Sequence, residues 1–149
     1  MKKALIILSV VFLALTGCGK KSGTIKCTMD KDLTYYKIES TYKINYTGKT
    51  VDSVETVEKA ISDNSTVLDT LEKTLKQTYE NANKTYGGYT IDIKKSDKDV
   101  VSTVTIDYNK MNISQFVKDQ PSLKSYVDGD KLTVDGIKSI YVAMGATCE

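Results

Sequence analysis

Few side chains in this 149-residue sequence could form or break covalent bonds, because it contains no histidine and all 21 of its basic residues are lysine. Without histidine there is no Ser-His-Asp triad and no imidazole metal site, and without arginine there is no bidentate clamp for phosphate. The possible reactive groups are therefore Asp, Glu, Lys, Tyr, Ser, Thr and Cys, and the last of these includes three cysteines, Cys18, Cys27 and Cys148. Their chemistry depends on the compartment in which the chain folds.

The first 17 residues have the pattern of a secretory signal peptide. Lys2 and Lys3 precede an apolar stretch, residues 4–15, that only Ser9 interrupts. This stretch of about a dozen residues is shorter than the ~20 that a helix needs to span a bilayer. We therefore expect residues 1–17 to be removed and the rest of the chain to be exported.

Residues 15–18 read Leu-Thr-Gly-Cys and resemble at every position the bacterial lipobox, a cleavage site that ends in an obligatory cysteine. The resemblance implies that Cys18 carries acyl chains such as palmitate and becomes the first residue. Two acyl chains give stable membrane attachment, whereas one gives marginal binding. We expect residues 18–23 to form a lipidated tether that anchors an extracytoplasmic domain to the bacterial cell membrane. The alternative is an ordinary signal peptide beside an incidental cysteine.

With Cys18 assigned to lipid, Cys27 and Cys148 remain near the two ends of the exported chain. A disulfide between them is the expected state on the oxidising side of a membrane. Two alternatives stay open. The thiols could be free if the cell exterior lacks dedicated oxidation, or they could form a redox-active pair, although catalytic dithiols usually lie close together as C-x-x-C.

Charge and composition limit the classes of protein to which this chain can belong. Lys2 and Lys3 account for the whole formal charge of +2, which leaves 19 lysines and 19 acids in the exported part. A neutral chain without arginine lacks the basic surface that binds nucleic acid by counterion release, so we expect no nucleic-acid partner. With 40% hydrophobic and 27% charged residues, we expect residues 24–149 to form a single globular domain and to be monomeric.

The hydrophobic pattern predicts an α+β fold, with an antiparallel sheet of about five strands and two or three helices packed on one face. Residues 36–46 alternate between apolar and polar side chains, which is typical of a half-buried strand. Val51, Val54 and Val57 are spaced by three, which does not fit a flat strand but which a bulge in the next strand would reconcile. The other strands are predicted around residues 24–29, 89–93 and 100–108.

Three segments predict helices. Residues 66–84 place an apolar stripe on one side and follow several good capping residues at 62–65. Residues 111–127 are partly helical until Pro121 interrupts them. The last helix begins after Thr133 and ends at Gly145, and the tail beyond it should return Cys148 to the first strand.

The order of two strand groups around a helix, together with three short segments, resembles the YehR-type bacterial lipoproteins, a family of unknown function. The segments are Leu-Thr-Gly-Cys at 15–18, Val-Thr-Ile-Asp-Tyr-Asn-Lys-Met at 104–111, and Leu132-Thr133-Val134 before a helix that stops at Gly145. The resemblance spans nearly the whole exported chain. It implies a small lipid-tethered α+β domain and supplies no catalytic motif.

The candidate contact residues are aromatic. Tyr86 and Tyr89 flank two glycines in a predicted loop, where they could form a contact surface, although tyrosines of the strands are better explained as core. Acid pairs at 30/32, 97/99 and 128/130 do not extend to a calcium loop, and each falls in a predicted turn, where aspartate bonds to local backbone. We expect no metal and no cofactor.

No motif for nucleophilic catalysis is present in the sequence. The leading hypothesis is a non-enzymatic lipoprotein that displays a binding or interaction module at the cell envelope, toward a partner or ligand that the sequence does not name. The alternative is an enzyme or enzyme accessory that acts on cell-envelope material.

Overall fold

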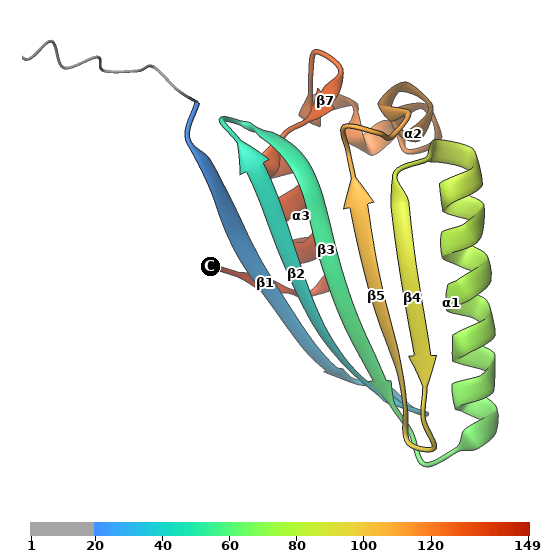
Figure 1. Cartoon of the computed structure of the whole chain (residues 1–149). Helices are drawn as coiled ribbons and strands as arrows, with labels where there is room; N and C mark the ends of the chain where they lie inside the picture. The colour runs from blue at the N-terminus through green and yellow to red at the C-terminus, as the bar shows by residue number, and fades with distance from the viewer. Residues whose placement is uncertain (1–19) are drawn as a thin grey trace, which may run out of the picture.

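The computed structural model describes residues 20–149, so the predicted signal peptide and Cys18 lie outside the described residues. One antiparallel sheet forms the body of the molecule, and its strands run in the order β4-β5-β3-β2-β1-β8 (Figure 1). The elements along the chain are β1 (Ser22–Asp32), β2 (Lys37–Thr47), β3 (Thr50–Ile61), α1 (Ser65–Tyr86), β4 (Tyr89–Lys95), β5 (Asp99–Asp107), α2 (Ile113–Asp119), the 3₁₀ helix η1 (Pro121–Tyr126), β6 (Val127–Asp128), β7 (Lys131–Leu132), α3 (Val134–Met144) and β8 (Thr147–Cys148).

The alternation of residue types along β2 decides which face of the sheet is buried. Tyr42 and Ile44 are almost fully buried, while Lys43 between them is exposed. In register with Tyr42 and Ile44, β3 contributes Thr56 and Val54 to the same face. Because side chains of neighbouring strands stand side by side on one face, these residues form a continuous buried layer.

A β-bulge lies where it was expected, in β3 near its start. The register between β2 and β3 shifts at Asn45/Tyr46, so that Tyr46 pairs with Val51 while Asn45 pairs with Ser53. The extra residue, Asp52, brings Val51 onto the buried face together with Val54. Val57 lies three residues further on, where the alternation has no second interruption, and it points to the opposite face.

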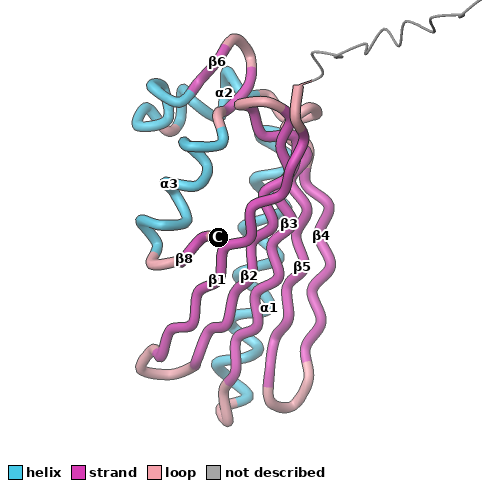
Figure 2. The backbone as a smooth tube through the Cα atoms, turned by 90° about the vertical axis from the view of Figure 1, so that its left-hand side faces the viewer, coloured by secondary structure: helices cyan, strands magenta, loops and turns pink. Residues whose placement is uncertain are grey.

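Helices α1 and α3 both pack on the buried face. Tyr79 of α1 donates a hydrogen bond to Glu58 on β3, and Tyr141 of α3 stacks on Tyr42 with ring centroids 4.1 Å apart. Tyr42 also donates to Glu58, so the two helices meet one side-chain cluster from two sides. In Figure 2, α3 lies to the left of the strands and α1 runs along β4 and β5.

Both long helices begin at the residues that the sequence indicates. The side chain of Asn64 accepts hydrogen bonds from the backbone N–H groups of Thr66 and Val67 at the start of α1. Thr133 caps α3 in the same way by accepting from Gly136. Gly145 ends α3 in the left-handed region at φ +103°, which favours glycine.

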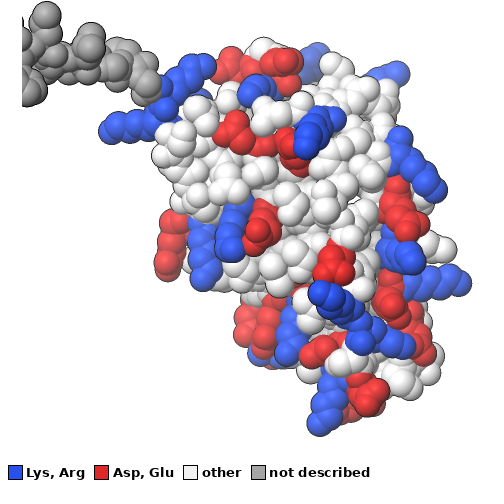
Figure 3. Space-filling model, viewed as in Figure 1, with Lys and Arg blue, Asp and Glu red and all other residues white. Residues whose placement is uncertain are grey.

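The other face of the sheet is not covered by any element of residues 20–149. A cross-strand row of Thr28, Thr41, Val57 and Thr103 runs across it by register. Figure 3 shows lysines and acids interspersed over most of this side of the molecule. Threonine suits a pleated surface that is in contact with water, so this face needs no cover to be stable.

The predicted fold class is confirmed: the protein is α+β, with helices on one face of an antiparallel sheet. The main sheet has six strands instead of about five, because the C-terminal tail pairs with β1 as β8. A separate ribbon, β6–β7, forms where a simple turn was expected. Among residues 20–149, no helix is both long enough and apolar enough to cross a membrane.

Candidate functional site

The predicted disulfide is present between Cys27 of β1 and Cys148 of β8. The two residues are direct register partners, and Cys27 is fully buried. Backbone hydrogen bonds between Lys26 and Glu149, at 2.9 and 3.2 Å, hold the tail beside β1. The bond therefore fixes the C-terminal tail, 121 residues further along the chain, to the first strand. Neither thiol is free for redox chemistry in this form.

The predicted lipidation site, Cys18, lies two residues before the first described residue. From Lys20 onward the chain follows the sheet: the Gly48 N–H donates to the carbonyl of Lys21 at 2.8 Å, and the Lys20 side chain lies against Gly48. Residues 22 and 23, expected in the lipidated tether, instead belong to β1, because they pair with Thr47 and Tyr46. The segment between Cys18 and the folded body is therefore shorter than predicted.

Tyr86 and Tyr89, the predicted contact residues, are both half-buried and pack against the core. The Tyr86 ring meets Phe116 edge-on with centroids 5.2 Å apart, and its hydroxyl donates to Asp119 at 3.1 Å. The backbone N–H of Tyr89 donates to Asn83 at 3.0 Å. Burial raises the pKa of both phenols. Half-burial leaves each of these side chains only part of its surface for contact with a partner.

A carboxylate bound by tyrosines lies at the centre of the helix-covered face, although no sequence motif marks it. Glu58 is half-buried and accepts hydrogen bonds from Tyr42 at 3.2 Å and Tyr79 at 3.3 Å. No ion pair among residues 20–149 includes it. The alternation that follows the bulge, Val54, Thr56, Glu58, was the signal that could have placed Glu58 on this face.

Two buried serines flank Glu58 on the neighbouring strands. Ser40 of β2 and Ser102 of β5 are its direct register partners. Their Oγ atoms are buried and have no hydrogen-bond partner among the described residues. Buried polar groups normally have partners, so a row of three polar side chains with two unpartnered hydroxyls is unusual on a buried face.

Two tyrosines, Tyr42 and Tyr79, act as hydrogen-bond donors to Glu58. Burial raises the pKa of Tyr42 to about 12, and it also raises the pKa values of Tyr79 and Tyr141. At neutral pH all three phenols keep their protons, so Tyr42 and Tyr79 stabilise the Glu58 carboxylate instead of serving as bases. The cluster can hold a negative charge beneath α1 and α3 and thereby link both helices to the sheet.

A groove of about 410 Å³ runs between α1 and the edge strand β4. Tyr89, Ile91 and Ile93 form its floor, and they alternate along β4 so that their side chains share one face. Polar residues at spacings of three and four along α1 form the facing wall. These wall residues are Glu72, Lys76, Glu80 and Asn83.

Along this groove, the backbone of β4 has N–H and C=O groups that no neighbouring strand pairs with. β4 is an outer strand whose only neighbour in the sheet is β5. The Tyr89 N–H donates to Asn83 of α1 and therefore points away from β5. Because alternate residues of an antiparallel strand point the same way, the N–H and C=O groups of Ile91 and Ile93 also face outward. Such an edge can pair with another extended chain.

Among residues 20–149, no three or more acidic or cysteine side chains come together in a way that could hold a metal ion. The acid pairs were predicted to lie in turns, but Asp30 and Asp32 belong to the end of β1, and only the 97/99 and 128/130 pairs flank tight turns, between β4 and β5 and between β6 and β7. Ser96 donates to Asp99 at 2.6 Å, and Lys59 pairs with the same carboxylate at 3.2 Å. These contacts lower the pKa of Asp99.

Two solved structures share this fold. A protein from Streptococcus pneumoniae TIGR4, studied by NMR, is 18% identical with a TM-score of 0.51, over 100% of this chain and 94% of that one. The NMR structure of the E. coli YehR protein is also 18% identical, with a TM-score of 0.56, over 87% of this chain and 92% of that one. The resemblance to YehR is thus confirmed at the level of the fold. No family model matches the chain, and no curated protein matches it significantly.

Proposed function

We propose that this YehR-like fold is a lipid-anchored module on the outer side of a bacterial membrane, and that it acts by binding an extended segment of an envelope partner, without catalysis. The Leu-Thr-Gly-Cys sequence at 15–18 supports the anchor. The Cys27–Cys148 disulfide supports an oxidising compartment, since structural disulfides are rare in reducing cytoplasm.

One observation carries the binding role: an edge strand with outward-facing backbone groups lies beside a groove with an apolar floor. An extended peptide that pairs with Ile91 and Ile93 would satisfy those groups, and its alternate side chains would contact the floor and the α1 wall. Main-chain hydrogen bonds supply affinity in this mode of recognition, while side-chain pockets supply specificity.

The binding role is tested by photo-crosslinking in intact cells. A benzoylphenylalanine at Asp92, which lines the groove, should give a crosslink to one partner. The same probe at Thr28, which lies on the same face of the sheet as Asp92 but on β1, far from the β4 edge, is the matched control and should not. Ile91→Pro removes an N–H that points away from β5, so the sheet remains while pairing with the partner is lost.

In the Ile91→Pro background, the Asp92 crosslink should disappear while the circular dichroism spectrum stays unchanged. A crosslink that persists in this variant, or that forms equally from Thr28, contradicts the proposal of strand pairing at β4.

The anchor is tested separately by mass spectrometry of the protein purified from membranes. A chain that begins at Cys18 and carries acyl chains supports the proposal, and Cys18→Ala should move the protein out of the membrane fraction. An intact leader or an unacylated first residue would refute the anchor.

A further inference from the structure

The end of the sheet at which β1 begins is close to Cys18 along the chain. Its closeness to the membrane therefore rests on the proposed anchor. Only Gly19 separates Cys18 from Lys20, and the Lys20 side chain already lies against Gly48 in the turn between β2 and β3. Two extended residues span at most ~7 Å. An acylated Cys18 would therefore hold this turn within reach of the lipid headgroups.

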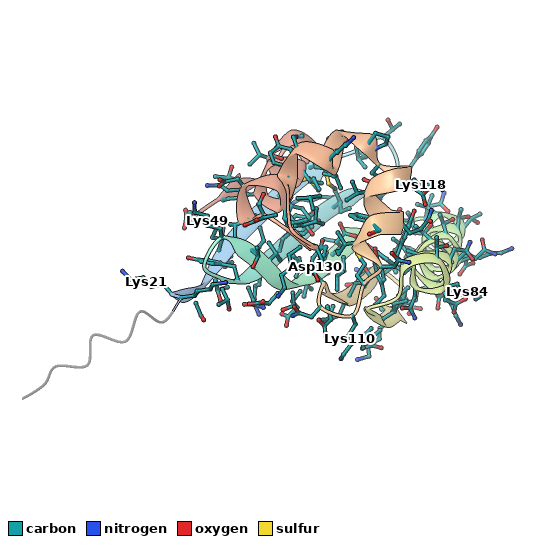
Figure 4. All side chains as sticks on the ribbon, turned by 90° about the horizontal axis from the view of Figure 1, so that it is seen from above. Lys21, Lys49, Lys84, Lys110, Lys118 and Asp130 are labelled. Atoms are coloured by element: carbon teal, nitrogen blue, oxygen red, sulfur yellow. A yellow bond between two sulfur atoms is a disulfide. The ribbon has the colours of Figure 1, made fainter. Side chains whose placement is uncertain are left out.

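Lysines gather at this end of the molecule. Viewed from above in Figure 4, Lys21 and Lys49 lie near the chain entry, and Lys84, Lys110 and Lys118 lie further along the same end. Among residues 20–149, Lys110 is paired with Asp107 at 3.1 Å, whereas no ion pair includes Lys20, Lys21 or Lys49. Those three charges are available to a ligand.

One acid, Asp52, lies in the corner itself, where it accepts a hydrogen bond from Thr47 at 2.7 Å, whereas others at this end lie further from the chain entry. Asp130 lies on the β6–β7 hairpin, away from the chain entry in Figure 4, and Asp128 is on the same hairpin. With Lys20, Lys21 and Lys49 against Asp52, the β1–β2–β3 corner keeps a net positive charge. Where the grey trace leaves the molecule, Figure 3 shows lysine side chains gathered at the surface.

A hollow of about 530 Å³ opens beside this corner. Ile25, Tyr46, Tyr126 and Val134 supply its apolar wall, and Lys49 and Asp135 supply charge. Tyrosines with an apolar ring and a polar hydroxyl are enriched at the level of lipid headgroups. The hollow therefore has the chemical character of a surface that contacts the membrane interface.

We infer that the β1–β2–β3 corner, defined by Lys20, Lys21 and Lys49 and the adjacent hollow, is a docking surface for the anionic phospholipid headgroups of the membrane that holds the anchor. Charge complementarity and the two-residue distance to Cys18 select this occupant. In this orientation, the opposite end, with residues 33–36, 62–64 and 96–98, points away from the bilayer. The groove along β4 then stays accessible to a partner.

The inference is tested on the protein purified from membranes and reconstituted in vesicles that carry a paramagnetic lipid headgroup. With phosphatidylglycerol present, NMR amide signals of residues 46–50 should broaden, while those of residues 33–36 and 96–98 should not. Replacing Lys20, Lys21 and Lys49 by Gln should reduce the broadening, because the loss of each lysine should weaken binding to the anionic headgroups about fivefold. The matched control replaces Lys31, Lys73 and Lys98 by Gln and should behave like the parent.

Equal broadening at both ends, or equal behaviour of the two triple variants, would overturn the docking surface. Broadening that depends on protein concentration instead of lipid charge would assign the corner to a second copy of the chain and overturn it too. Mass spectrometry of the same sample separates the two proposals: absence of acyl chains on Cys18 refutes the anchor, whereas uniform broadening of an acylated protein refutes only the docking surface.

Discussion

The hydroxyl of Tyr79 on α1 donates a hydrogen bond to Glu58 on β3 at 3.3 Å, and this pair links the longest helix to the middle of the sheet. The other oxygen of the same carboxylate accepts from Tyr42 at 3.2 Å, and the Tyr42 ring stacks on Tyr141 of α3. Since α1 and α3 are connected through this one acidic side chain, Glu58 should influence how both helices pack.

Removing the Tyr79 hydroxyl should destabilise the protein. Tyr79→Phe loses a hydrogen bond to a charged acceptor, for which we expect a decrease of ~1–2 kcal/mol in the free energy of unfolding, because Glu58 is only half-buried. Urea denaturation with the disulfide intact measures the change. Tyr35→Phe is the control, since Tyr35 is 73% exposed, and it should leave stability unchanged. Equal effects of the two variants would show that the Tyr79 contact contributes nothing.

Stability should fall at high pH through Tyr42. Burial raises the pKa of Tyr42 from about 10 in the unfolded chain to about 12 in the folded one. The folded state therefore retains a proton that the unfolded state loses, and the stabilisation is complete below pH 10 and disappears as pH rises through 12. Tyr79 and Tyr141 shift in the same direction.

Urea unfolding between pH 9 and 12 measures this effect. The free energy of unfolding should decrease across the window, and Tyr42→Phe should show a shallower decrease than the parent protein. A flat profile, or an increase in stability above pH 10, contradicts the direction of the shift.

The disulfide should contribute a large part of the stability. In the chain-entropy model a bond that closes a loop of this length adds roughly 4–5 kcal/mol, although native disulfides typically contribute 2–5 kcal/mol. We expect the Cys27→Ala, Cys148→Ala double variant to unfold at a clearly lower temperature, as calorimetry would measure. Reductant should shift the parent protein in the same way and leave the double variant unchanged. A parent protein insensitive to reductant would contradict the prediction.

Several parts of the fold were predictable because the signal is local. The alternation in residues 36–46, the capping residues Asn64 and Thr133, and the stop at Gly145 each depend on a few neighbouring residues, and all are confirmed. The partner of Cys27 was predictable because only one other thiol remained after Cys18 was assigned to lipid.

The candidate sites were less predictable, since they depend on contacts between distant segments. An apolar stripe shows which side of α1 is buried. It does not show that the helix lies along β4 and β5 and leaves a groove at the sheet edge. Glu58 was missed because a single acid in a strand looks like a solvent-facing residue until the bulge at Asp52 fixes the phase of the alternation. Tyr86 and Tyr89 were expected in an open loop, but α2 folds back and Phe116 covers part of Tyr86.

Gly136→Ala should destabilise the protein even though alanine is the better helix former. In α3 an added Cβ would overlap the Cβ of Tyr126 and lie 2.7 Å from its Cγ, too close for any side chain. Overpacking of this kind typically costs ~1–3 kcal/mol, which exceeds the ~1 kcal/mol that alanine gains over glycine in a helix. Lys138→Ala, in the same helix, is the control for propensity alone and should change stability little. If thermal unfolding shows Gly136→Ala to be as stable as the parent or more so, the close packing of α3 against Tyr126 is wrong.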